Sequence, residues 1–162
     1  MQLDAEPLLA ELANKIGAIA HDTAIVGIHT GGVWAAEKLH AALNASLPLG
    51  KLAVTLHRDD FGKIGLHPQK KSTDMPFDIE GRHVLLVDDV LNTGRTLRAA
   101  LNELFDFGRP ASVKLAVLVD RGRRELPFSA DYVGATMALD ASQELVLKNE
   151  NYVLRFTLRQ RT

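Results

Sequence analysis

The chain contains no cysteine and no apolar run of the roughly 18 residues that a membrane-spanning helix requires. Without cysteine, disulfides, thiolate metal sites and a cysteine nucleophile are excluded. There is no excess of charge of either sign, because 19 basic residues face 20 acidic ones, so any contact with nucleic acid has to come from a local patch. The first six residues also lack the cationic start of a secretory signal. These absences predict a soluble, cytoplasmic protein that does not enter a membrane.

Strand and helix patterns alternate along the 162 residues, a length that suits one domain with a full core. Buried strands are predicted at residues 23–29, 51–56, 84–87 and 112–120, and helices at about residues 8–19, 36–43 and 93–107. Two later segments, 144–148 and 152–159, alternate like antiparallel edge strands. We therefore predict a single three-layer α/β domain over residues 1–162, with a central, mostly parallel sheet.

Residues 84–96, VLLVDDVLNTGRT, combine an apolar strand with paired acids and a small, hydroxyl-rich turn. Four aliphatic residues in a row predict a strand buried on both faces of a parallel sheet, and ligands of such sheets bind at the carboxyl ends of the strands. There Asp88 and Asp89 can accept hydrogen bonds from vicinal hydroxyls. The turn leads into a helix whose free N–H groups suit a phosphate, and its residues are Asn92, Thr93, Gly94, Arg95 and Thr96. A ribose 5-phosphate fits both the acid pair and the turn. The acid pair alone would indicate only a solvated strand end.

Thr30, Gly31 and Gly32 follow the first strand and precede a helix. They offer backbone N–H groups with no bulky side chain in the way, which suits pyrophosphate. An ordinary glycine turn before a helix would have the same sequence, so the assignment of this loop to pyrophosphate depends on the motif downstream.

Arg58, Asp59 and Asp60 end the second strand. Arg58 can reach the same edge of the sheet and neutralise pyrophosphate, while the two acids can orient it or hold Mg²⁺ through water. On the residues alone, a surface ion-pair cluster explains these three positions equally well.

The run 84–96 resembles the 5-phosphoribosyl 1-pyrophosphate (PRPP) motif of type I phosphoribosyltransferases. The closer resemblance is to the PyrR-type pyrimidine-operon regulators and uracil phosphoribosyltransferases of that family, and it covers most of the chain. It rests on further segments in the same order and spacing, at residues 26–33, 56–60, 108–127 and 130–134. It implies the type I phosphoribosyltransferase fold, with a small hood at residues 121–143, a mobile lid at residues 61–78 and a non-proline cis peptide in the pyrophosphate loop.

The resemblance also implies a reaction of pyrimidine salvage, in which N1 of uracil displaces pyrophosphate from C1 of PRPP and gives UMP. Asp88, Asp89 and Arg58 would act at the reacting centre, and Mg²⁺ would be the cofactor, bound through PRPP with possible help from Asp59, Asp60, Asp88 and Asp89. The loop 30–32 and the turn 92–96 would hold PRPP. The base would lie against Asp120, Arg121, Gly122 and Arg123. The lid would keep water from an oxocarbenium-like transition state.

Two positions depart from the PyrR pattern. Gly31 stands where arginine is frequent, so a cationic pyrophosphate contact is either missing or supplied elsewhere, and Arg123 stands where histidine is common. The early helix, which is basic in RNA-binding members, carries only Lys15 as a cation over residues 9–16. We therefore predict weak or no binding of pyrimidine leader RNA. A patch that could overturn this prediction would comprise Arg121, Arg123, Arg124, Arg155, Arg159 and Arg161.

Three functions stay open at this point. The first is a uracil phosphoribosyltransferase, the second a nucleotide-sensing pyrimidine regulator that binds RNA and catalyses little, and the third a phosphoribosyltransferase for another base. The resemblance implies a homodimer or tetramer in each case. A dinucleotide-binding module is disfavoured, because no Gly-x-Gly-x-x-Gly follows a strand.

Overall fold

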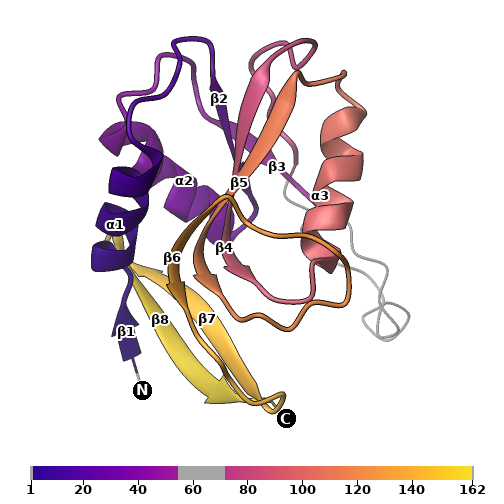
Figure 1. Cartoon of the computed structure of the whole chain (residues 1–162). Helices are drawn as coiled ribbons and strands as arrows, with labels where there is room; N and C mark the ends of the chain where they lie inside the picture. The colour runs from indigo at the N-terminus through magenta and orange to yellow at the C-terminus, as the bar shows by residue number, and fades with distance from the viewer. Residues whose placement is uncertain (1, 55–71, 162) are drawn as a thin grey trace.

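A five-stranded parallel sheet forms the centre of the computed structural model, which describes residues 2–54 and 72–161 (Figure 1). The strands lie in the order β3-β2-β4-β5-β6, and every neighbouring pair runs parallel. Their bounds are β2 (Ala24–Ile28), β3 (Gly50–Leu52), β4 (His83–Leu91), β5 (Ser112–Asp120) and β6 (Tyr132–Thr136). The predicted α/β fold with a parallel sheet is confirmed.

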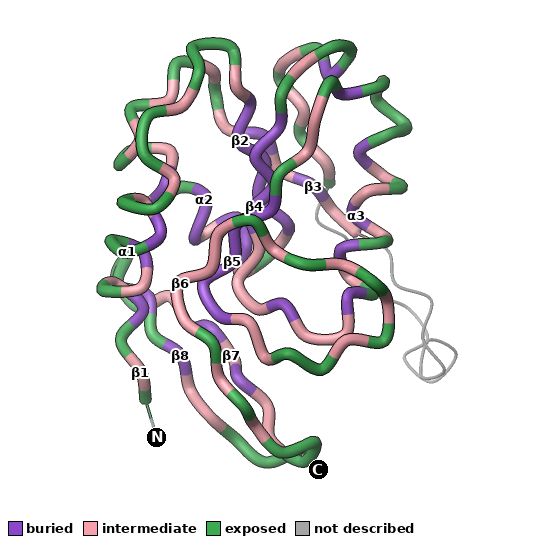
Figure 2. The backbone as a smooth tube through the Cα atoms, in the orientation of Figure 1, coloured by how far each residue is buried: buried purple, intermediate pink, exposed green. Residues whose placement is uncertain are grey.

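Helices cover both faces of this sheet and give the predicted three layers (Figure 1). The helices α1 (Glu6–Ile16) and α2 (Gly31–Ala42) lie on one face, and α3 (Arg95–Phe105) lies on the other. Figure 2 shows the buried residues concentrated along the central strands and on the inward sides of the helices. Among the described residues, no helix is long and apolar enough to cross a membrane.

The two faces have separate apolar cores because successive strand residues point to opposite sides. Leu85 belongs to the cluster that includes Leu12 and Leu39 of the first two helices. Leu86, the next residue of β4, belongs to the cluster that includes Leu104 of α3. The aliphatic run of β4 therefore serves both cores at once, which explains why it shows no alternation of polar and apolar residues.

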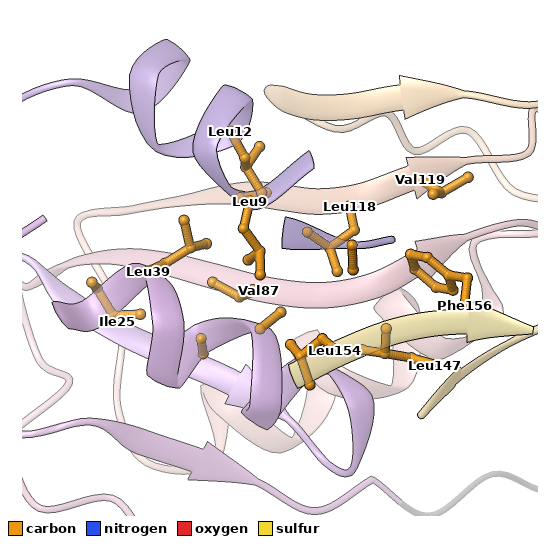
Figure 3. Close-up of a cluster of buried hydrophobic side chains, with 14 of the residues drawn as sticks. Leu9, Leu12, Ile25, Leu39, Val87, Leu118, Val119, Leu147, Leu154 and Phe156 are labelled. Atoms are coloured by element: carbon orange, nitrogen blue, oxygen red, sulfur yellow. The ribbon is translucent and has the colours of Figure 1, made fainter. Parts of the chain in front are cut away.

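A second, smaller sheet is built from residues near both ends of the chain. It has the order β1-β8-β7, with β1 (Gln2–Asp4), β7 (Gln143–Glu150) and β8 (Val153–Gln160) all antiparallel to their neighbours. Its apolar side packs into the core on the α1 and α2 side, where Leu147, Leu154 and Phe156 lie near Val87 and Leu118 (Figure 3). The two predicted antiparallel strands thus pair with each other, and β8 also pairs with β1, a strand that the sequence pattern did not predict.

Element bounds also differ from the prediction at the acid pair. The sequence predicted a strand that ends at Asp88 and Asp89, whereas β4 continues through both to Leu91. Pairing with β5 carries the strand onward, since Asp88 lies opposite Val117 and Leu91 lies opposite Asp120. The acids therefore lie within the sheet, close to its carboxyl edge.

The hood and lid segments can be placed in part. Within the predicted hood, 121–143, residues 132–136 form β6 at the edge of the main sheet. Residues 61–71 of the predicted lid, together with Arg58, Asp59 and Asp60, lie outside the described residues. Of the described remainder, Asp74 pairs with Lys51 through two backbone hydrogen bonds of 2.7 and 2.8 Å, which extends the edge of the sheet beyond β3.

Candidate active site

The acid pair lies on the central strand, and both of its residues are largely buried. The backbone N–H of Asp89 donates to Oδ1 of Asp88 at 2.9 Å, and that of Val90 donates to Oδ1 of Asp89 at 2.8 Å. Burial of the Asp88 carboxyl, together with the charge of Asp89 and a hydrogen bond between the two side chains, raises the pKa of Asp88 well above its usual range. Such a pair favours ligands that bring hydroxyl donors or a cation, because either would offset the crowded negative charge.

The glycine loop at the end of β2 lies directly against this pair. A Cβ atom on Gly31 would fall 2.1 Å from Oδ2 of Asp89, and one on Gly32 would fall 2.6 Å from the carbonyl oxygen of Val87. Only a residue without a side chain allows so close an approach. The peptide bond between His29 and Thr30 is cis, as the resemblance implied. The loop and the acid pair, predicted separately, are therefore brought together by the parallel neighbours β2 and β4.

The turn after β4 leads into the first turn of α3. Gly94 has a φ of 95°, a left-handed conformation that favours glycine. The hydroxyl oxygen of Thr93 accepts the backbone N–H of Arg95 at 3.2 Å. The free N–H groups and the positive end of the dipole of this 11-residue helix then face the carboxyl edge of the sheet. This is the geometry that an anionic group such as a phosphate requires.

Two further side chains of the turn differ in how they are held. Arg95 forms an ion pair of 2.7 Å with Glu125, and both side chains are more than half exposed. By contrast, Oδ1 of Asn92 is buried and has no hydrogen-bond partner within the described part of the chain. Buried acceptors in folded proteins are normally satisfied, so this oxygen is suited to receive a donor from a bound molecule.

The predicted base-side segment begins where β5 ends, with Asp120 opposite Leu91 of β4. Both oxygens of Asp120 are already bonded, since Arg124 donates to them at 2.9 and 2.7 Å and the N–H of Gly122 adds a third bond at 2.8 Å. The hydrogen bonds from Arg124 are the main cause that lowers the pKa of Asp120. In this structure Asp120 orders its own segment, and a role in contacting a base stays a prediction.

The two other arginines of this segment differ in environment. Arg121 donates through Nη2 to the carbonyl oxygen of Asp140 at 3.1 Å, while its Nε is buried and unpartnered among the described residues. Burial, followed by the nearby charges of Arg123 and Arg161, lowers the pKa of the Arg121 guanidinium. Arg123 itself is exposed, like Gly122 before it. The backbone of this segment meets the end of β4, since the N–H of Arg121 donates to the carbonyl oxygen of Leu91 at 2.8 Å.

Magnesium coordination can be tested against the residues present. Within residues 2–54 and 72–161, no group of three or more His, Asp or Glu side chains converges as a metal cage would. Mg²⁺ commonly takes one or two carboxylates and completes its shell with water and substrate phosphates. The paired carboxyls of Asp88 and Asp89 fit that mode, because a cation would offset both the burial and the neighbouring charge that raise the pKa of Asp88.

Sequence reasoning gave the Arg124 side chain no role inside the site, yet its guanidinium makes more hydrogen bonds than any other side chain described. The signal was present in the spacing. Asp120 and Arg124 are four residues apart with a glycine between them, a separation that allows the chain to turn and the two charges to meet.

Comparison with known proteins agrees with this geometry. A model of the phosphoribosyl transferase domain matches residues 2–144. The bifunctional protein PyrR of Ralstonia nicotianae is 52% identical over 155 residues, which cover 92% of this chain and 88% of that protein. The protein of the same name from Pseudomonas savastanoi is 55% identical over 149 residues, covering 89% and 88%.

Solved structures extend the likeness to the fold. The hypoxanthine phosphoribosyltransferase of Trypanosoma cruzi in a ternary substrates complex superposes with a TM-score of 0.63 at 28% identity, covering 83% of this chain and 79% of that one. A hypoxanthine-guanine phosphoribosyltransferase of Bacillus anthracis reaches a TM-score of 0.67 at 21% identity, covering 84% and 82%, and supports the fold alone. The chain belongs to the phosphoribosyltransferase family and, within it, to the PyrR-type proteins.

Proposed function

We propose that this protein is a uracil phosphoribosyltransferase that makes UMP and pyrophosphate from uracil and PRPP. The observation that carries the proposal is the meeting of three groups at one edge of the parallel sheet. These groups are the acid pair of β4, the glycine loop that touches it and the turn that opens α3. Each suits a different part of PRPP, namely the ribose hydroxyls, the pyrophosphate and the 5-phosphate.

The roles follow from the order of the groups along the edge. Asp88 and Asp89 would accept hydrogen bonds from the 2- and 3-hydroxyls of the ribose. The N–H groups of the turn and of the first turn of α3 would bind the 5-phosphate, and those of residues 30–32 would bind the pyrophosphate. Uracil would then lie toward residues 121–124, where backbone groups can read its carbonyls and N3–H. Arg58, Asp59 and Asp60 keep their proposed role at the pyrophosphate.

The reaction needs no covalent intermediate with the protein. The bond from C1 to the pyrophosphate oxygen breaks, the bond from C1 to N1 of uracil forms, and the proton on N1 passes to water. Negative charge near C1 would stabilise the positive charge that develops on the ribose ring, and Asp88 and Asp89 would supply it. Asp88 and Asp89 would help PRPP to hold Mg²⁺, whose charge would favour departure of the pyrophosphate. The proposed lid, 61–78, would exclude water that could otherwise capture C1.

A screen of bases tests the proposal directly. The protein is mixed with PRPP, Mg²⁺ and one base at a time, and both pyrophosphate release and the nucleotide formed are measured. We expect rapid release with uracil and formation of UMP. Rapid release with hypoxanthine or guanine but not uracil would assign the chain to another base, and no release with any base would favour a nucleotide-sensing regulator.

A second function, in pyrimidine-gene regulation, is favoured by the relatives named bifunctional protein PyrR. The contact with RNA would have to come from outside the early helix, since Lys15 is its one cation and donates to the carbonyl oxygen of Val133 at 2.8 Å. We propose that regulation, if present, works with weak affinity for RNA. The assembly is proposed to be a homodimer or tetramer, which light scattering at several concentrations would measure.

A further inference from the structure

The guanidinium of Arg124 is bonded through all three of its nitrogens. Its Nε donates to the carbonyl oxygen of Phe128 at 2.7 Å, and its Nη1 donates to the carbonyl oxygen of Asn92 at 2.9 Å. Nη1 and Nη2 also hold the two oxygens of Asp120 at 2.9 and 2.7 Å. The Arg124 and Asp120 side chains are only 22% and 18% exposed, so water screens this ion pair much less than it would at the surface.

The partners of Arg124 belong to three separate segments. Asn92 begins the turn proposed to bind the 5-phosphate, Asp120 ends β5, and Phe128 follows the base-side segment. The ring of Phe128 in turn lies against Gly94, since a Cβ atom there would be 3.2 Å from its Cδ2. Arg124 is the one described side chain that bonds to all three segments.

Backbone hydrogen bonds join the same two sides of the site. The N–H groups of Glu125 and Leu126 donate to the carbonyl oxygen of Thr93 at 2.9 and 3.1 Å. A further backbone bond, from the N–H of Arg121 to the carbonyl oxygen of Leu91 at 2.8 Å, joins the base-side segment to the end of β4. Arg124 adds the side-chain contacts between these attachments, because it holds the carbonyl group of Asn92 and the carboxylate of Asp120 at the same time.

We propose that Arg124 is a positioning residue that sets the base-side segment 121–124 at a fixed place relative to the phosphate turn 92–96. The inference rests on the proposed function, since it concerns how that site holds the two ends of one nucleotide. The planar guanidinium suits this task because its donors point in fixed directions and can hold a carboxylate with two bonds while others reach carbonyl groups. A lysine at the same position would have one nitrogen and could not reach all three segments.

A positioning role for Arg124 predicts a pattern of ligand binding that simple stabilisation of the fold would not produce. UMP reaches both halves of the site, whereas uridine lacks the phosphate and ribose 5-phosphate lacks the base. If Arg124 fixes the spacing of the halves, its loss weakens UMP far more than either fragment, because only UMP depends on that spacing. If Arg124 merely stabilises the chain, binding of UMP and its fragments changes in parallel.

The test compares the binding of UMP, uridine and ribose 5-phosphate to the wild-type protein and to Arg124→Gln, Arg124→Lys and Asp120→Asn. We expect UMP affinity to fall about tenfold or more in Arg124→Gln and Arg124→Lys, a size typical of coupling between sites, with each fragment close to its wild-type affinity. Asp120→Asn, which leaves one good acceptor for Arg124, should give a smaller loss of the same kind.

A matched control is Lys38→Gln, which removes a lysine that lies 3.3 Å from Glu6 on the far side of the sheet from α3. It should leave all three affinities unchanged. Parallel changes of UMP and fragments, no change, or unfolding of all three site variants would each overturn the proposal. A wild-type protein that neither binds UMP nor forms it would instead refute the proposed function, so the two failures are distinguishable.

Discussion

The carboxylate of Asp89 occupies the space beside Gly31, where any side chain would begin 2.1 Å from its Oδ2. The absence of a side chain at Gly31 allows the acid to approach the loop. Gly31 and Asp89 therefore form one structural unit, and a substitution at either position should change the conformation at the other.

Gly31→Ala tests this relationship. Placing a methyl group into occupied space usually has a penalty of about 1–3 kcal/mol, and we expect it to move the Asp89 carboxyl and weaken PRPP binding by roughly tenfold. The control is the same change in an Asp89→Ala background, where the two closest atoms are gone and only Cβ of residue 89 stays near, at 3.2 Å, so Gly31→Ala should have a much smaller further effect. Additive losses in the double variant would show that the two residues act independently.

Gly94→Val tests the phosphate turn. A β-branched residue at a φ of 95° is strained, and its side chain would press on Phe128. We expect weaker binding of both UMP and PRPP, because both carry the 5-phosphate, and the strain is of the order of 1–3 kcal/mol. Gly81→Val is the matched control, since Gly81 has a φ of 70° with open space around it and should lose stability but not affinity. Loss of PRPP binding alone would point to the loop 30–32 instead.

Asp88→Asn should make the ligand-free protein more stable at pH 8. The pKa of Asp88 is raised in the folded protein, so the folded state binds its proton more tightly than the unfolded state does. Stability from this group therefore increases as the pH falls from above its folded pKa toward the unfolded value of about 4. Asparagine cannot ionise, so the advantage of the variant should shrink over that range. Urea unfolding between pH 5 and 8 measures it, and a pH-independent difference would contradict the account.

Leader RNA of a pyrimidine operon should bind weakly and with a shallow dependence on salt. Lys15 is engaged with Val133, Arg159 is paired with Glu144 at 3.0 Å, and Arg124 is bonded inside the site. The cation of the early helix and two arginines of the candidate patch are thus already engaged within the chain, and each missing phosphate contact flattens the salt dependence. Filter binding at several salt concentrations, with an unrelated RNA as control, measures this. Tight, specific binding with a steep slope would identify Arg121, Arg123 and Arg155 as a surface that binds RNA.

The central part of the fold could be predicted from local patterns alone. The aliphatic runs of β4 and β5 are long and continuous, so they identify buried parallel strands, and the polar residues that follow them had to meet at the carboxyl edge. The contact between Gly31 and Asp89 is a direct result of that rule.

Features that depend on distant pairing could not be predicted in the same way. The strand β1 is three residues long and exists because it pairs with β8, more than a hundred residues away. Arg124 looked like one of several surface arginines, since nothing in the local sequence shows that the carbonyl groups of Asn92 and Phe128 lie within its reach. In both cases the deciding partners are brought together only by the folded sheet.

The most direct test of the account is a calorimetric titration of PRPP with Mg²⁺ into the wild-type protein and into the double variant Asp88→Asn with Asp89→Asn. Both acids lie at the edge of the sheet and outside the apolar cores, so the variant should fold, which circular dichroism checks. The account predicts binding to the wild type and a loss of about a hundredfold or more in the variant, as expected when two charged hydrogen-bond acceptors are removed. Equal affinity of the two proteins would contradict the assignment of the ribose site and, with it, the proposed reaction.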